Sequence, residues 1–145
     1  MKTGPNTCGL LVCMLMLAQT CQAECTLDVQ SVLLGSYDTV AGSAVNGIGE
    51  INVQCTPAAS YTLSLSTGQG SYASRELHSG LSEMNYNLYL DPSHTQVWGD
   101  GSGATSTAAG NTAEAWHTVY GRIDAGQHSL PAGTYTDQLM VTVEF

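Results

Sequence analysis

Basic residues are scarce in this chain: lysine and arginine together number 3, against 12 aspartates and glutamates. Nucleic-acid binding is excluded, because it needs clusters of Lys and Arg to neutralise phosphates. Attraction to anionic membrane surfaces is disfavoured for the same reason. The chain also lacks any run approaching the roughly 20 apolar residues of a transmembrane helix, and no stretch has convincing helical periodicity. We therefore expect a non-helical protein that neither binds nucleic acid nor inserts into a membrane.

The N-terminus predicts export. Lys2 supplies a positive charge, residues 10–18 (LLVCMLMLA) supply a short apolar segment, and residues 21–23 form a small-x-small cleavage site. Residues 1–23 are thus expected to be a signal peptide and residues 24–145 the mature chain. Its 122 residues suit a single domain with one core. Two arginines against 12 acidic residues give the mature chain a net charge of −10.

Cysteine usage agrees with export. Three of the five cysteines fall in the predicted signal peptide, which leaves Cys25 and Cys55 as a pair that we expect to be disulfide-bonded. The chain-entropy model gives such a loop about 3–4 kcal/mol of stabilisation. A two-cysteine metal site is the alternative, but neither a CxxC spacing nor a nearby histidine supports it. Lipid attachment at Cys21 is a further alternative, for which the preceding Thr20 fits poorly.

Alternating apolar and polar residues predict strands. The alternation is clear at 51–55, 61–65 and 86–90, with further candidate strands at 27–34 and 119–123. Short strands with glycine-rich joints favour an antiparallel sandwich or barrel over any α/β arrangement. The fold class expected is therefore all-β.

The C-terminal segment is the strongest predicted core strand. Tyr135, Leu139, Val141, Val143 and Phe145 are apolar at alternate positions, and the pattern continues to the last residue. An apolar strand with an unpaired edge is an aggregation hazard. We expect either an earlier strand of this chain or another polypeptide to cover it.

Motifs for catalysis or metal binding are missing. The histidines are dispersed without HxxxH spacing, although they could converge in the fold; they are His78, His94, His117 and His128. No GxSxG sequence places a nucleophile, and the glycine-rich loop at 99–110 precedes no helix that could bind phosphate. Asp100 in that loop is too little for calcium. We expect no enzyme, no catalytic residue, no cofactor and no metal.

Aromatic and basic residues are assigned by position. Tyr61 and Tyr86 lie on the apolar phase of their strands and are expected in the core. Trp98 and Trp116 lie at the ends of the glycine-rich region, where we expect them to be exposed and available for adhesive contact. Arg75 and Arg122 are expected to form isolated structural ion pairs.

A set of segments in order along the chain resembles one family, the spore coat protein U domain, which is similar to the subunits of archaic, Csu-type chaperone-usher pili. The segments are Cys25 with 35–38 (GSYD), 49–56 (GEINVQCT), 61–63 with Gly68 and Gly70, Arg75, 86–89 (YNLY), 97–101 (VWGDG), 120–123 (YGRI) and 133–145 (GTYTDQLMVTVEF). Each one alone is weak, but together they span nearly the whole of 24–145.

The resemblance implies an immunoglobulin-like sandwich that lacks its final strand, with the two cysteines bridged. In such pili a periplasmic chaperone lends a strand to the open groove, an outer-membrane usher exports the subunit, and a neighbouring subunit then replaces the chaperone. This is β-augmentation. The resemblance places Leu139, Val141, Val143 and Phe145 along one side of the acceptor groove.

The expected function is therefore that of a structural subunit of a pilus or surface coat, secreted through the periplasm to the cell surface. Cleavage after Ala23 leaves only Glu24 ahead of Cys25, where a polymerising subunit carries its donor segment. We accordingly expect a place at the fibre tip, with a role in attachment and biofilm formation, or a family member that does not polymerise in the usual way. The alternative is a freestanding secreted β-sandwich that binds carbohydrate or an apolar ligand. The sequence identifies no adhesive target, chaperone or usher.

Overall fold

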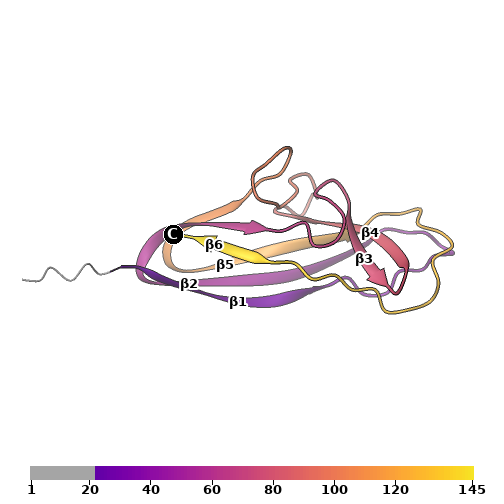
Figure 1. Ribbon diagram of the computed structural model, residues 1–145, viewed down its shortest axis with the longest axis horizontal. Coiled ribbons are helices and arrows are strands. Elements are labelled where there is room, and N and C mark those ends of the chain that lie inside the picture. The colour runs from indigo at the N-terminus through magenta and orange to yellow at the C-terminus, as the bar shows by residue number, and fades with distance from the viewer. Residues whose placement is uncertain (1–21) are drawn as a thin grey trace, which may run out of the picture.

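The computed structural model describes residues 22–145 and is entirely built of strands and loops over that range (Figure 1). The predicted signal peptide, residues 1–23, lies outside the described residues except for its last two. The strands are β1 (Glu24–Leu33), β2 (Val45–Leu65), β3 (Arg75–Ser79), β4 (Ser82–Tyr89), β5 (Ala108–Ile123) and β6 (Val141–Glu144). None of the described residues forms a helix that could span a membrane.

All strand pairs are antiparallel, and the six strands belong to one sheet with the order β1-β2-β5-β4-β3, while β6 pairs with the far end of β2. The two long strands β2 and β5 turn back together near the end where the C-terminus is labelled in Figure 1. The sheet is thereby folded over itself. The first layer holds β3, β4, β1 and the adjoining halves of β2 and β5, and the second layer holds their other halves and β6.

The turn in β2 coincides with a break in its pairing to β5. The register shifts between Gln54 and Ala59, and Pro57 lies inside this interval. Proline has no backbone N–H to donate to a ladder, so it is tolerated where pairing is interrupted. The chain can therefore change direction here without leaving a ladder donor unpaired.

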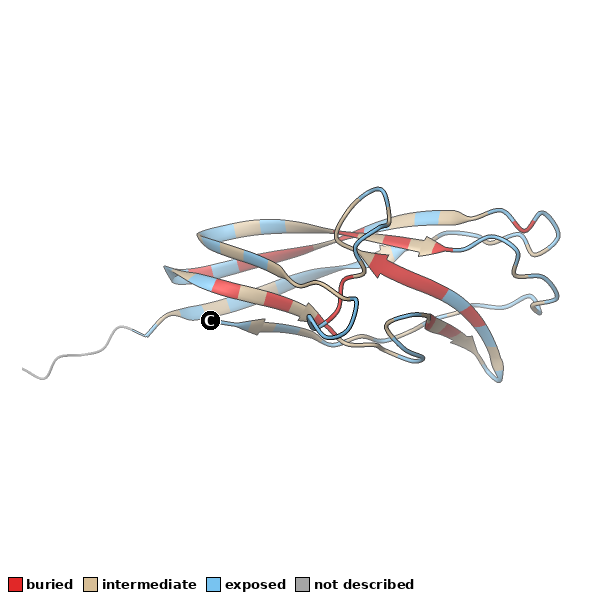
Figure 2. Cartoon of the chain, turned by 90° about the horizontal axis from the view of Figure 1, so that it is seen from above, coloured by how far each residue is buried: buried red, intermediate tan, exposed pale blue. Residues whose placement is uncertain are grey.

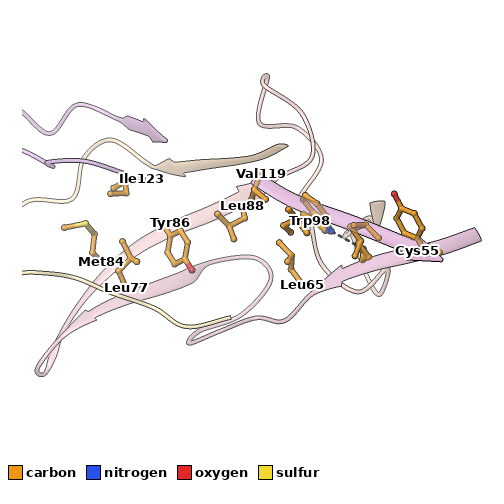
Figure 3. Packing of buried hydrophobic residues seen from close by; sticks show 13 residues of the cluster. Cys55, Leu65, Leu77, Met84, Tyr86, Leu88, Trp98, Val119 and Ile123 are labelled. Atoms are coloured by element: carbon orange, nitrogen blue, oxygen red, sulfur yellow. Dashed lines mark hydrogen bonds between the residues drawn. The ribbon is translucent and has the colours of Figure 1, made fainter. Parts of the chain in front are cut away.

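The core lies between the two layers. Buried residues alternate with more exposed ones along parts of β2 and β4, whereas Ile51–Val53 and Tyr86–Leu88 are buried without a break, and Figure 2 shows both kinds of stretch. In Figure 3 the labelled apolar side chains form a continuous row from Met84 and Leu77 at one end to Cys55 at the other. The expected all-β antiparallel sandwich is confirmed, as are the core positions of Tyr61 and Tyr86.

Cys25 and Cys55 are bonded, with an S–S distance of 2.05 Å. They are directly paired across β1 and β2, and Cys55 is buried. The predicted disulfide is confirmed. It joins the start of β1 to β2 just before β2 turns back.

The C-terminal strand is shorter than its sequence pattern predicts. Residues 137–140 belong to no ladder, and only Val141–Glu144 pair with β2. Phe145 is exposed. Before Val141, the apolar residues Tyr135 and Leu139 pack against the core. The segment 137–140 nevertheless forms no ladder with another strand.

Candidate functional site: an open side of the sandwich

One side of the sandwich is closed by the loop that carries Trp98. The Trp98 side chain is 0 % exposed; its backbone N–H donates to the Leu88 carbonyl in the first layer (2.9 Å). Its indole Nε1 donates to the Leu63 carbonyl in the second layer (3.2 Å). Trp98 therefore links the two layers, and the expectation that it is exposed in a surface loop is wrong. Its large ring fills the core that the small residues of the loop cannot fill.

The other side of the sandwich has no such cover. The strands β1 and β6 each pair with β2 along one edge, and within residues 22–145 their other edges have no partner strand. Residues 34–38, after β1, and residues 137–140, before β6, also belong to no ladder. They extend the uncovered side of the sandwich. Two edges with free backbone groups thus face the same opening.

A groove with a volume of about 1350 Å³ occupies this opening. One wall is formed by residues 29–39 and the other by 130–139 together with Val141. Its base reaches core side chains of both layers, among them Ile51, Leu65 and Leu88. This volume exceeds the roughly 300–1,000 Å³ of small-molecule pockets, and its walls include the end of β1 and the start of β6, whose outer edges have no partner strand within residues 22–145. The arrangement suits an extended polypeptide.

Glycines shape the first wall. Gly47, Gly49 and Gly121 face inward on β2 and β5, and we call these three residues the glycine surface. A Cβ on Gly49 would lie 2.7 Å from the Gln30 carbonyl oxygen, and one on Gly121 would lie 2.7 Å from Val32 Cγ1. The end of β1 therefore passes over the inner side of the first layer, where side chains on the glycine surface would block it. This crossing brings residues 32–39 to the groove.

A hydrogen bond holds the second wall. The Tyr86 hydroxyl donates to Asp137 Oδ2 at 2.7 Å, and the Gln69 backbone N–H donates to Asp137 Oδ1 at 3.1 Å. Burial, followed by the bond to Asp137, raises the pKa of Tyr86 above its usual value, so the hydroxyl remains a donor. Backbone bonds between His78 and Thr136 fix the same wall to β3.

The comparisons with known proteins agree with this geometry. The Spore Coat Protein U domain family matches residues 11–142. The chain belongs to this family. Protein U of Myxococcus xanthus is 30% identical over 127 residues, which cover 77% of this chain and 69% of that protein. The family resemblance drawn from the ordered segments is thereby confirmed.

The chain also matches a solved structure. The matching structure is one chain of the crystal structure of the CsuC–CsuE chaperone-tip adhesion subunit pre-assembly complex from archaic chaperone-usher Csu pili of Acinetobacter baumannii. The TM-score is 0.60 with 20% sequence identity, over 86% of this chain and 40% of that chain. The domain thus shares an immunoglobulin-like fold with that chain and spans about two-fifths of that chain's length.

The predicted groove residues of this domain fall into two groups. Leu139 and Val141 line the groove, while Val143 and Phe145 do not. Val143 packs against the core beside β2. Sequence reasoning missed the first wall, because the alternation in 27–34 predicts a strand and does not reveal that this strand crosses the sheet. The glycines opposite it, at 47, 49 and 121, are the sequence feature that could have indicated this crossing.

Of the two tryptophans, only Trp116 is exposed in this domain, at 54 %. It lies on β5 opposite Asn52 and not in the glycine-rich loop. The adhesive role of Trp116 stays a prediction, while the burial of Trp98 removes that residue as a contact.

The basic residues also differ from expectation. Arg122 forms the predicted ion pair, with Nε 3.0 Å from Asp124 Oδ1. Arg75 is 0 % exposed and forms no ion pair with the described carboxylates. It donates instead to the Ser66 and Trp98 carbonyls and to Asn87 Oδ1, at 2.9, 2.7 and 2.6 Å. Its role is to tie the closed side of the sandwich together.

Proposed function

We propose that this protein is a structural subunit of a chaperone-usher type pilus or surface coat, exported through the periplasm and assembled at the cell surface by donor-strand complementation. The observation that carries the proposal is the open side of the sandwich, where the free edges of β1 and β6 flank a groove that reaches the core. A strand from a second polypeptide would bond to both edges and place alternate side chains in the groove.

Family membership supports this assignment, and the similarity to a chaperone–subunit complex supports the partners that we propose with it. A periplasmic chaperone fills the groove first, an outer-membrane usher passes the subunit outward, and the strand of a neighbouring subunit replaces the chaperone. The function needs no catalytic group, and we propose that the protein is not an enzyme. The similarity to a structure that contains a chaperone and a tip adhesion subunit supports a place at the fibre tip, with roles in attachment and biofilm formation. Trp116 is the candidate contact residue.

The test is co-expression of the exported chain with a periplasmic chaperone from an archaic pilus system, followed by native size analysis and intact mass. We expect a one-to-one complex that a synthetic peptide of alternating apolar residues dissociates. Leu139→Asp places a charge in the groove and should weaken the complex at least tenfold. Leu81→Asp is the matched control, because Leu81 is fully exposed at the β3–β4 turn.

A stable monomer that binds neither the chaperone nor the peptide would contradict the proposal. It would favour a freestanding secreted domain that binds carbohydrate or an apolar ligand. Equal loss of chaperone binding in Leu139→Asp and Leu81→Asp would likewise contradict the assignment of the groove.

A further inference from the structure

The β3–β4 hairpin brings three metal-ligating side chains together. His78 pairs directly with Glu83 across the hairpin, and Glu76 lies two residues before His78 on the same strand. Residues two apart on a strand, and directly paired residues on neighbouring strands, share one face of a sheet. The three side chains therefore project from one face, and one ligand atom of each lies within 4.8 Å of those of the other two.

His78 Nε2 lacks a hydrogen-bond partner. This atom is buried from solvent and, within residues 22–145, is the one buried side-chain nitrogen or oxygen without a partner. Buried polar atoms in proteins are normally satisfied, and an exception calls for a water, an ion or another explanation. Glu76 Oε2 lies 3.4 Å from His78 Nε2.

That distance has a specific meaning for a metal ion. Ligands about 2.0–2.1 Å from Zn²⁺ at tetrahedral angles are separated by about 3.4 Å. His78 Nε2 and Glu76 Oε2 are therefore already spaced as two ligands of one tetrahedral ion. Glu83 is exposed, so its side chain can rotate to bring its carboxylate to the same ion at little cost in energy.

The charge of the hairpin also calls for a cation. Glu76 and Glu83 place two carboxylates near each other, and the described part of the chain has no lysine and only two arginines, Arg75 and Arg122. Arg75 is directed to the Ser66 and Trp98 carbonyls, and Arg122 pairs with Asp124. Neither arginine neutralises the pair, and the basic side chain that contacts it is His78, 3.4 Å from Glu76 Oε2.

We propose that Glu76, His78 and Glu83 form a binding site for a divalent transition-metal ion of the Zn²⁺ type, with solvent as the fourth ligand. An imidazole with two carboxylates suits Zn²⁺ and, by the general affinity order, Cu²⁺, whereas Ca²⁺ and Mg²⁺ prefer all-oxygen sites. The sequence pattern hides this site, because its ligands come from two strands joined by a turn. The expectation of no metal rests on the absence of HxxxH spacing and allows only for several histidines converging, whereas this site combines one histidine with two glutamates.

The site is connected to the groove by the backbone. The His78 N–H donates to the Thr136 carbonyl at 2.8 Å, and the Thr136 N–H donates to the His78 carbonyl at 3.0 Å. Thr136 lies in the second wall of the groove, and Leu77 lies at its base. A metal ion on His78 thus immobilises the strand to which that wall is attached.

The experiment is a Zn²⁺ titration, by calorimetry, of the exported chain purified with its disulfide intact and stripped with EDTA. We expect one Zn²⁺ per chain, a higher Tm with Zn²⁺, and at least tenfold weaker binding of Ca²⁺ and Mg²⁺. His78→Gln and Glu83→Gln should each weaken Zn²⁺ binding at least tenfold. The matched controls His94→Gln and Glu144→Gln, which lie outside the hairpin, should bind as the unchanged chain does.

A second measurement separates metal binding from folding. Circular dichroism without metal should be the same for all four variants, and Co²⁺ should give the intense visible bands of a tetrahedral site only where the three ligands remain. Hydrogen exchange should show slower exchange at the His78 and Thr136 amides with Zn²⁺. Absent Zn²⁺ binding, or equal binding in His78→Gln and the unchanged chain, would overturn the proposal. Neither result would bear on strand uptake, which the chaperone experiment tests separately.

Discussion

A buried guanidinium illustrates how single residues hold the closed side of this sandwich. Arg75 contacts neutral acceptors on three separate segments, and its carbon atom Cζ lies 5.4 Å from the centre of the Tyr72 ring. Burial lowers the pKa of Arg75, because the charged group has lost its water. The fork of donors compensates for that loss by bonding to carbonyls that would otherwise be unsatisfied.

Arg75→Lys should destabilise the protein by about 2–4 kcal/mol, because an ammonium cannot reproduce the planar fork and leaves buried carbonyls unpaired. Urea unfolding of the purified chain measures this. Arg122→Lys is the control, since its ion pair with Asp124 is largely exposed and should change stability by less than about 0.5 kcal/mol. Similar losses for both substitutions would show that the buried network is not the cause.

His117 lies between the layers at the end where β2 and β5 turn back. Its Nε2 is 2.8 Å from the Tyr61 hydroxyl, and its ring meets those of Tyr61 and Trp98 edge-on. Burial lowers the pKa of His117 below 6.5 and raises the pKa of Tyr61. The folded protein therefore contains a neutral pair that shares one hydrogen bond.

Stability should fall as the pH drops below about 6.5, because the unfolded chain then takes up a proton on His117 that the folded chain resists. Urea unfolding at pH 7.5 and 5.5 should show this loss, and His117→Gln should reduce it. The carboxyls whose pKa is lowered by hydrogen bonds titrate below their usual 3.8 and lie outside this window; they are Asp38, Asp91 and Asp100. The same pH dependence in His117→Gln as in the unchanged chain would contradict this reading, and His94→Gln serves as the control.

At the scale of the strands, the alternation of apolar and polar residues predicted most of the strands. It did not predict where β2 turns back or where β1 passes over the sheet. The patterns at 51–55 and 61–65 predicted two strands, and both belong to the single strand β2. Period-two alternation reports which face a side chain occupies, but it carries no information on a turn within a sheet. The short strand β3 was missed because Arg75 and His78 interrupt its apolar pattern.

The crossing of β1 gives a prediction for the glycine surface. Gly49→Ala should cost about 2–3 kcal/mol, because its new methyl meets the Gln30 carbonyl at 2.7 Å and backbone cannot easily move aside. Gly121→Ala should cost less, about 1 kcal/mol, because it meets the side chains of Val32 and Leu34, which can shift. Thermal unfolding ranks the two variants. The opposite order would show that the whole of β1 shifts to make room for the new methyl group. Ala109→Ser, at an exposed position of β5, is the control.

The whole molecule combines one closed side and one open side, and the sequence revealed only part of that contrast. The apolar C-terminal pattern predicted an edge in need of cover, and Leu139 and Val141 do line the groove. Trp98 was assigned to the surface because small polar residues surround it along the chain, but the fold turns its side chain between the layers. Such long-range contacts depend on how the layers are stacked and leave no local signal.

Hydrogen exchange should reveal the same contrast in the isolated chain. Amides in the paired halves of β2 and β5 should exchange slowest, because they form ladders at the centre of the sheet. In the segments 34–38 and 137–140, the amides of 34–38, Asp137 and Leu139 donate no hydrogen bond within the described residues and should exchange much faster, whereas Gln138 and Met140 donate to side-chain oxygens. When a donor-strand peptide is added, residues in and beside these two segments should become protected together, since one inserted strand bonds to both edges. Protection of only one edge would mean that the occupant lies against a single strand, and the groove would then be an ordinary apolar surface and not the place of a missing strand.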